Sequence, residues 1–228
     1  MIDHSLLNPA LTGAELDAGC RLAKQYDVAS VCILPYYVAG CVELLEGSKV
    51  QPSTTIGFPH GGHATFTKVA EVEQALKDGA TELDAVINIS KTRSGDWDYV
   101  RSEIEALTVA THAGGAKIKV IFENAYLDDA AKIHLCEICG EAEADWVKTS
   151  TGFAPSGATV ADVRLMRKHS PGRVQVKAAG GVRSLDALLE MREAGATRVG
   201  TSATAQILED CLRQLGLATL APNSLVAR

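Results

Sequence analysis

Two lysines occupy matching places in two short motifs. Lys148 lies in VKTSTG (147–152) and Lys177 in VKAAGG (176–181), and each follows an apolar run typical of a buried strand. An amine attacks a carbonyl carbon only when neutral, and lowering a lysine pKa from about 10.4 to about 7 requires about 4.6 kcal/mol. A second ammonium about 5 Å away supplies roughly 3 kcal/mol at an effective dielectric of 20, and burial can add to it. The pair therefore predicts a lysine that forms an iminium, and we expect the neighbouring charge to lower its pKa more than burial does. The two motifs leave open which lysine is the nucleophile.

A carboxylate is expected beside these lysines. Asp84 lies in LDAVIN (83–88), a pattern typical of a strand buried on both faces, where an unpaired carboxylate would be costly. We expect Asp84 to pair with a lysine and to shuttle protons, two roles that are compatible. Asp3 and Cys32 fall on strands that would open to the same region. Cys32 is interpreted as a packing residue, because no histidine partner for a nucleophilic thiol is indicated.

Two glycine-containing segments precede predicted helices. GGVRS (180–184) leads into a helix that begins near Leu185, and GTS (200–202) leads into the next one. Backbone N–H groups at helix starts bind phosphate, so two adjacent segments of this kind, with Gly152 nearby, predict a phosphate site. The alternative is that glycine serves only the tight turns between strand and helix.

Two other motifs contain residue types that can bind metal or undergo redox chemistry, but neither predicts such a site. His60 and His63 flank two glycines in a flexible loop with no third ligand, so we predict no metal site and no cofactor. Cys136 and Cys139 form a C-x-x-C inside an apolar helical pattern, which favours buried thiols.

The segments around these motifs alternate between short apolar runs and amphipathic stretches, which is typical of a parallel sheet with helical connections. The predicted strands start near eight positions: Ile2, Ala29, Thr54, Glu82, Lys117, Asp145, Arg173 and Thr197. Helical spacing covers eight stretches: 16–26, 37–45, 69–76, 100–110, 130–138, 160–167, 185–191 and 203–212. Four glycines are predicted to end helices in the left-handed conformation: Gly79, Gly114, Gly140 and Gly195.

This repeated unit extends over residues 1–228 without a linker, so we predict an α/β fold with a single domain, a single (β/α)8 barrel. The active site of such a barrel lies at the C-terminal ends of its strands, where both lysines would point. An open doubly wound sheet is the competing fold, but the first strand is not followed by G-x-G-x-x-G.

The composition is that of a globular protein. Of the 228 residues 46% are hydrophobic and 22% charged, which excludes a disordered or coiled-coil chain. The net charge of −6 disfavours nucleic acid as a partner. We find no secretory signal and no apolar stretch long enough to span a membrane, so we expect a cytoplasmic protein whose six cysteines are thiols.

Taken together, the motifs resemble the deoxyribose-phosphate aldolase family, class I aldolases with the TIM-barrel fold that use a Schiff base. The similarity covers nearly the whole chain and is carried by IDH (2–4), ASVC (29–32), IGFP (56–59), VINI (86–89), VKTSTGF (147–153), VKAAGGVR (176–183) and GTS (200–202).

This resemblance implies reversible cleavage of 2-deoxy-D-ribose 5-phosphate to D-glyceraldehyde 3-phosphate and acetaldehyde by a homodimer. It implies that Lys148 forms the Schiff base, with Lys177 and Asp84 as proton relay. A substrate hydroxyl would lie near Asp3 and Thr151, with Cys32 in the same binding region. The phosphate would be held by Gly152, Gly180, Gly181, Arg183, Gly200 and Ser202.

Three positions depart from the family pattern. Asn8 replaces a lysine of many relatives, Asn124 follows Glu123 where threonine is commoner, and the tail 224–228 lacks a terminal tyrosine. These differences concern turnover and the route of the C2 proton. The alternatives are another phosphosugar Schiff-base aldolase, a phosphosugar-binding sensor without catalysis, and a metal-dependent aldolase, which would need three spaced ligands.

Overall fold

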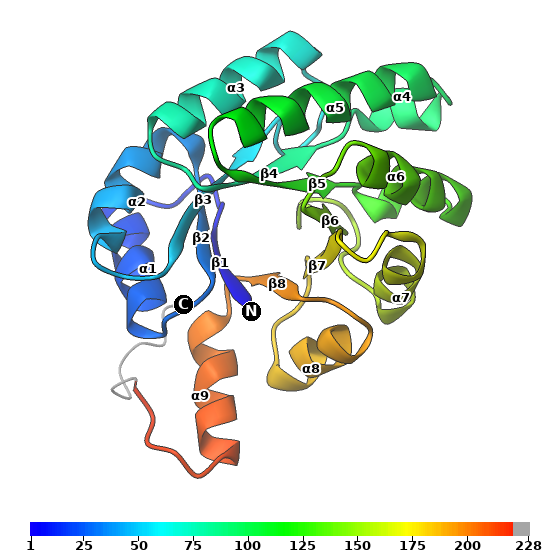
Figure 1. Cartoon of the computed structure of the whole chain (residues 1–228). Coiled ribbons are helices and arrows are strands. Elements are labelled where there is room, and N and C mark those ends of the chain that lie inside the picture. Colours follow the sequence, from blue (N-terminus) through cyan, green and yellow to red (C-terminus); the bar gives the residue numbers. More distant parts are fainter. Residues whose placement is uncertain (221–228) are drawn as a thin grey trace.

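The fold is a closed barrel of parallel strands. The computed structural model describes residues 1–220, and in them each strand pairs with the next while β8 pairs with β1. The predicted (β/α)8 barrel is therefore confirmed, and the open doubly wound sheet is wrong. Figure 1 shows the strands around the centre with the helices outside them. The strands are β1 (Ile2–Leu6), β2 (Ser30–Ile33), β3 (Gln51–Ile56), β4 (Glu82–Val86), β5 (Lys117–Ile121), β6 (Trp146–Lys148), β7 (Gln175–Ala179) and β8 (Arg198–Thr201).

The helices cover the outer face of the sheet. Several begin at a polar side chain that caps the free N–H groups of the first turn, as Thr12, Asp128 and Ser184 do. The helices are α1 (Gly13–Gln25), α2 (Val38–Leu45), α3 (Thr65–Lys77), α4 (Ile89–Arg93), α5 (Trp97–Ala113), α6 (Asp129–Glu141), α7 (Val160–His169), α8 (Leu185–Glu193) and α9 (Thr204–Gln214), with short 3₁₀ turns at Pro35–Tyr37 and Asn124–Tyr126. The eight predicted helical stretches all fall on these elements.

The structure corrects the expected end of the fourth strand. The apolar run that continues to Ile89 suggests a longer strand, but β4 ends at Val86 and α4 begins at Ile89. Asn88 causes the change, because its side chain accepts a hydrogen bond from Lys91 N at 3.1 Å and caps the short helix.

The left-handed conformation predicted for four helix-ending glycines is confirmed at two of them. Gly79 and Gly195 adopt positive φ as expected, at 95° and 113°. Gly114 is the C-cap of α5 as predicted but has φ −87°, and Gly115 adopts the left-handed conformation in its place. Gly140 lies inside α6, where a Cβ would come within 2.6 Å of Pro171 Cγ. Gly114 is similarly close to Leu76, so both glycines allow close packing of neighbouring segments.

A fully buried ion pair fixes the carboxyl end of β4 from outside the barrel. Lys68 of α3 and Glu103 of α5 are joined at 2.9 Å. Lys68 Nζ also donates to Val86 O at 2.8 Å, and Glu103 accepts from Asn88 N at 2.9 Å. The strand that carries Asp84 is thereby held where it leaves the barrel.

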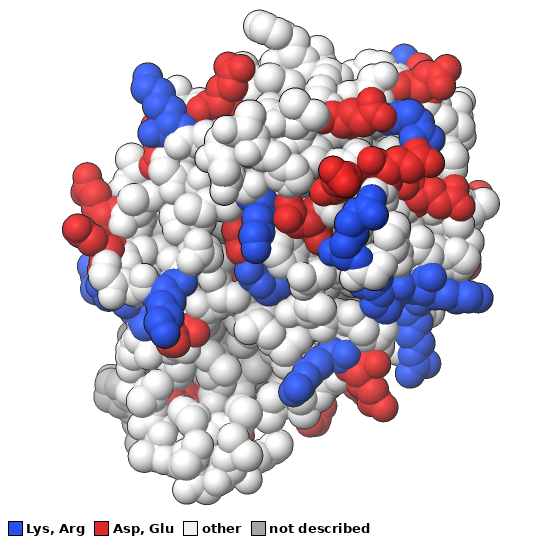
Figure 2. Space-filling view, viewed as in Figure 1, with Lys and Arg blue, Asp and Glu red and all other residues white. Residues whose placement is uncertain are grey.

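Two further features concern the charged surface and the end of the described chain. Figure 2 shows Lys and Arg side chains interspersed with Asp and Glu on this face. Residue Leu220 is attached to the body of the molecule, because its N–H donates to Glu209 and its carbonyl accepts from Gln25 Nε2. The tail 224–228, with its missing tyrosine, lies outside the described residues. Within residues 1–220 no helix has the length and apolar character needed to cross a membrane.

Candidate active site

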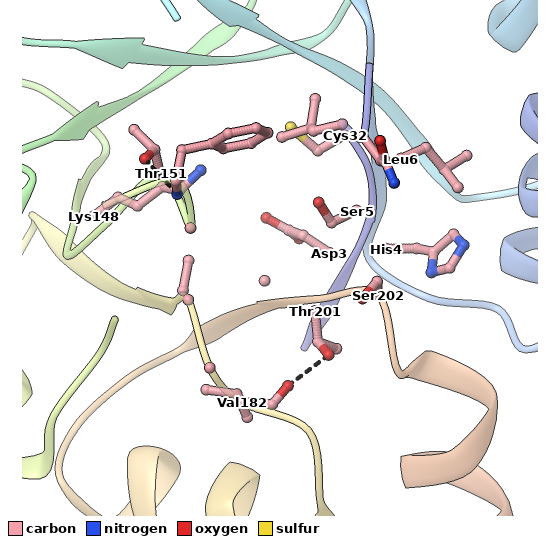
Figure 3. Close-up of a pocket in the computed structure, with 18 of the residues that line it drawn as sticks. Asp3, His4, Ser5, Leu6, Cys32, Lys148, Thr151, Val182, Thr201 and Ser202 are labelled. Carbon is pink, nitrogen blue, oxygen red and sulfur yellow. Dashed lines mark hydrogen bonds between the residues drawn. The ribbon is translucent and has the colours of Figure 1, made fainter. Parts of the chain in front are cut away.

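A cavity of about 660 Å³ opens at the carboxyl ends of β1, β2, β6, β7 and β8. Figure 3 shows Asp3, Ser5 and Cys32 from β1 and β2 facing Lys148 and Thr151 across it. Eleven of the twelve site residues singled out in the sequence line this cavity, namely Asp3, Cys32, Lys148, Thr151, Gly152, Lys177, Gly180, Gly181, Arg183, Gly200 and Ser202. The twelfth, Asp84, lies below the floor.

The two lysines are direct neighbours in the sheet. Lys148 and Lys177 are paired in the register of β6 and β7, so both side chains point into the barrel at the same level. Lys148 Nζ donates to Asp84 Oδ2 at 2.6 Å, and Lys177 Nζ donates to the same oxygen at 2.7 Å. Lys177 also forms an ion pair with Asp3 Oδ2 at 2.6 Å. The structure thus brings together the residues that the sequence separated by 64 and 93 positions from Asp84.

The two lysines have opposite pKa shifts. Burial lowers the pKa of Lys148; Asp84 opposes this effect and the Lys177 charge adds to it. At Lys177 burial also favours the neutral amine, but Asp3 and Asp84 outweigh it and raise the pKa. The expectation that the neighbouring charge outweighs burial at Lys148 is therefore wrong, because the side chain is only 3% exposed. The geometry favours Lys148 as the neutral amine, a choice that the two motifs alone left open.

A layer of charged residues beneath the lysines was missed in the sequence. Lys119 of β5 contacts Asp84 at 2.9 Å and Glu82 at 2.6 Å. Arg198 of β8 reaches both Glu82, at 2.5 Å, and Asp3. The sequence feature that could have revealed this layer is Lys119 inside the apolar run KIKVI (117–121), because an unpaired charge buried in a strand would be costly.

This layer is charge-balanced when Lys148 is neutral. Three cations, Lys119, Lys177 and Arg198, then face three carboxylates of Asp3, Glu82 and Asp84. Lys119 and Lys177 have raised pKa values because carboxylates surround them, despite their burial. Among these ion-paired residues, Lys148 is the lysine whose pKa is lowered.

The glycine-containing segments form the rim of the cavity. Gly152, Gly180 and Gly181 all have positive φ, which only glycine adopts without strain. GGVRS (180–184) leads into α8, which begins at Leu185 as predicted, and Ser184 caps the first turn of this helix. Gly200 lies against Lys177 and Ala179 in the sheet, and Ser202 is exposed at the mouth.

The remaining residues noted in the sequence lie in different surroundings, some of them at the cavity and some away from it. Burial raises the pKa of the Cys32 thiol, which agrees with a packing residue. Asn8 lines the cavity but uses its side-chain oxygen to accept from Ala10 N. His60 and His63 are exposed and do not line the cavity. Cys136 and Cys139 are buried, and over residues 1–220 we find no group of three potential metal ligands.

A closed (β/α)8 barrel with a buried lysine cluster beneath a glycine-rimmed cavity has the features of a barrel enzyme that attacks carbonyl compounds with an amine. The DeoC/LacD family aldolase model matches residues 1–213, and the chain belongs to this family. The family resemblance seen in the sequence is confirmed.

Three known proteins illustrate the similarity. The chain is 62% identical to a deoxyribose-phosphate aldolase of Rhodopirellula baltica over 95% of this chain and 90% of that protein. It is 48% identical to a deoxyribose-phosphate aldolase of Caldanaerobacter subterraneus over 94% and 93%. The tetrameric deoxyribose phosphate aldolase of Aeropyrum pernix superposes with a TM-score of 0.86 at 32% identity, covering 94% of this chain and 90% of that one.

Proposed function

We propose that the protein reversibly cleaves 2-deoxy-D-ribose 5-phosphate to D-glyceraldehyde 3-phosphate and acetaldehyde through a Schiff base on Lys148. The observation that carries this proposal is the buried Lys148 at the cavity floor, where burial and the Lys177 charge lower its pKa despite its contact with Asp84 and so favour a neutral nucleophilic amine. The names of the relatives supply the substrate.

The proposed reaction begins when Lys148 Nζ attacks C1 of the open-chain sugar. The carbinolamine takes up a proton on its oxygen and loses water, which leaves a cationic iminium. Removal of the proton from the C3 hydroxyl then breaks the C2–C3 bond, so that glyceraldehyde 3-phosphate departs and the electron pair remains as an enamine. Protonation at C2 and hydrolysis release acetaldehyde and restore the amine.

Lys177 and Asp84 are the proposed proton relay for these steps. Lys177 is the group with a proton to give, because the carboxylates around it raise its pKa. Asp84 accepts hydrogen bonds from both lysines on one oxygen, and surrounding cations hold its pKa well below the ordinary value. We therefore propose that Asp84 takes part in the relay by holding the two amines on one oxygen, while Lys177 exchanges protons with the substrate.

The rim of the cavity is the proposed phosphate site. Gly152, Gly180, Gly181, Arg183, Gly200 and Ser202 all line it, and the first turn of α8 adjoins this group. Asp3 and Thr151 also line the cavity, and we propose that they bind a substrate hydroxyl, with the uncharged Cys32 thiol in the same binding region.

Borohydride trapping with acetaldehyde tests this function. Reduction should add an ethyl group to Lys148, located by peptide mass spectrometry, and Lys148→Arg should abolish both labelling and cleavage because arginine cannot form the iminium. A label on Lys177 alone would reverse the assignment. A wild-type protein that binds the phosphosugar but is never labelled would instead be a sensor without catalysis.

The proposal extends to assembly and compartment. We propose a homodimer, on the family resemblance, and a cytoplasmic location, supported by six cysteines that are all free thiols in the structure. Sedimentation equilibrium should give twice the chain mass. A fourfold mass would show the assembly described for the Aeropyrum pernix enzyme instead.

A further inference from the structure

Glu123 combines two costly features at the end of β5. Its backbone adopts the left-handed conformation with φ 57°, and its side chain is buried although no ion-pair partner is found among the described residues. The other non-glycine residues with positive φ, Asp27 and Glu143, are exposed and directly follow the ends of α1 and α6. Glu123 instead precedes the 3₁₀ turn Asn124–Tyr126, and its side chain caps no N–H group of that turn, so other contacts account for its buried position.

The carboxylate of Glu123 is bound entirely to the loop that follows Lys148. Its Oε1 accepts from Thr151 N at 3.2 Å, and its Oε2 accepts from the Thr151 hydroxyl. The backbone on either side is tied to the same loop, because Phe122 N donates to Lys148 O and Asn124 N donates to Thr149 O, both at 2.9 Å.

These contacts fix the direction of the Thr151 hydroxyl. A hydroxyl has one proton to donate and two lone pairs to accept with. The proton is donated to Glu123, and one lone pair accepts from Phe153 N at 3.0 Å. Thr151 lines the cavity beside Lys148, whereas Glu123 does not (Figure 3). The hydroxyl therefore has no proton left to donate to a ligand, and its remaining lone pair can accept a hydrogen bond from one.

We propose that Glu123 is a positioning residue that makes Thr151 a fixed hydrogen-bond acceptor, so that the site selects acceptor aldehydes carrying a hydroxyl group that donates to Thr151. The inference rests on the proposed aldolase function. The hydrogen bond to Glu123 also polarises the threonine hydroxyl, which strengthens the remaining acceptor.

The test is the aldol addition of acetaldehyde to two phosphorylated aldehydes. D-Glyceraldehyde 3-phosphate carries the hydroxyl, and 3-oxopropyl phosphate lacks it. In Glu123→Gln the amide oxygen can still accept from Thr151 N, while the amide NH₂ donates to the Thr151 hydroxyl and turns its proton into the cavity. The ratio of kcat/KM for the two aldehydes should fall by about tenfold, through slower reaction of the hydroxylated one.

Matched variants separate positioning from general damage. Thr151→Ser should keep the ratio, Thr151→Val should lose it, and adding Glu123→Gln to Thr151→Val should lower it no further. Glu137→Gln, an exposed carboxylate on α6, should change nothing. An unchanged ratio in Glu123→Gln, or an equal loss with both aldehydes, overturns the proposal.

A failure of the proposed function and a failure of this inference would give different experimental results. A wild-type protein that is not labelled at Lys148 by acetaldehyde and borohydride would refute the aldolase chemistry itself. A labelled protein whose aldehyde ratio does not respond to Glu123→Gln would refute only the role of Glu123.

Discussion

Lys148 and Lys119 are both buried lysines, but they stand in different electrostatic situations. Lys119 contacts three carboxylates, Asp3, Glu82 and Asp84, whereas Lys148 contacts only Asp84 and shares it with two other cations. A neutral Lys148 contributes no charge to this balance. Of the three lysines that contact Asp84, the catalytic candidate is therefore the one whose charge this ion-pair network needs least.

This difference predicts unequal losses of stability when either lysine is replaced. Lys119→Met should lower the free energy of unfolding by about 3–5 kcal/mol, because it leaves buried carboxylates uncompensated. Lys148→Met should change it by less than about 1 kcal/mol, because a flexible apolar side chain replaces an amine that is already neutral. Urea denaturation of both variants checks the prediction, and an equal loss in the two would contradict the neutral state of Lys148.

Lys177→Leu tests how the pKa of Lys148 is set. The variant removes the like charge that lowers this pKa and leaves Asp84 with one cation fewer, so the pKa should rise. Burial, the largest cause, stays in place, so we expect a shift of about one unit. A raised pKa means that the neutral amine forms only at higher pH, so the rate of acetaldehyde trapping should rise with pH over a more alkaline range. If the pH dependence of trapping does not shift in the variant, burial alone sets the pKa of Lys148.

At the residue scale the sequence indicated the right positions but not their connections. Lys148, Lys177 and Asp84 could be singled out because charged residues inside apolar strands need partners. Lys119, Glu82 and Arg198 escaped notice because they act below the strand ends, in layers that only the barrel register defines. Glu123 was noted for its neighbour Asn124, and its left-handed backbone has no signature in a sequence.

At the scale of elements, the loop after β6 and the loop after β7 depend on one another. Gly157 and Gly180 pack so closely that a Cβ on Gly157 would come within 2.1 Å of Gly180 O. Ala158 N donates to Gly180 O at 3.0 Å, which fixes the contact. The rim of the cavity is thus built from two loops in contact.

Gly157→Ala should displace Gly180 and damage the proposed phosphate site. We expect KM for 2-deoxyribose 5-phosphate to rise at least about tenfold, with a much smaller change in cleavage of unphosphorylated 2-deoxyribose. Gly172→Ala is the matched control, because no atom lies within 4 Å of its added Cβ. Steady-state kinetics with both sugars checks this, and an equal effect on both would argue against a phosphate role for the rim.

The elements themselves were predictable to within a few residues, and the exceptions have local causes. The fourth strand was drawn too long because an apolar run cannot reveal that Asn88 caps α4. The left-handed conformation predicted for Gly114 and Gly140 is absent because these two glycines serve close packing, against Leu76 and Pro171. At the end of α6 a glutamate, Glu143, takes the positive φ instead.

At the scale of the whole molecule, the charged layer joins strands from opposite sides of the barrel. Arg198 links β8 to β1 and β4, and Lys119 links β5 to β1 and β4. The closed fold was predictable from the repeat, but this internal bracing was not, because it joins residues 195 positions apart.

This bracing predicts a steep loss of stability in acid. Cations lower the pKa values of Asp3 and Asp84 in the folded protein despite burial, so below about pH 4 the unfolded chain binds more protons than the folded one. Their contribution is fully present above the ordinary Asp pKa of about 3.9 and is lost as pH falls toward the folded values. With two such groups the free energy of unfolding should fall by up to about 2.7 kcal/mol per pH unit there. Urea titrations at pH 5, 4 and 3 check this, and a flat profile would contradict it.

The balance of three cations and three carboxylates has a consequence for the reaction cycle. On the proposed mechanism the proton that the carbinolamine needs comes from Lys177, so the iminium cation appears as the Lys177 ammonium loses its charge. When the C2–C3 bond breaks, Lys177 regains a proton while the iminium becomes a neutral enamine. The cluster therefore holds three positive and three negative charges at each stage, and the covalent intermediates need no counterion from solvent.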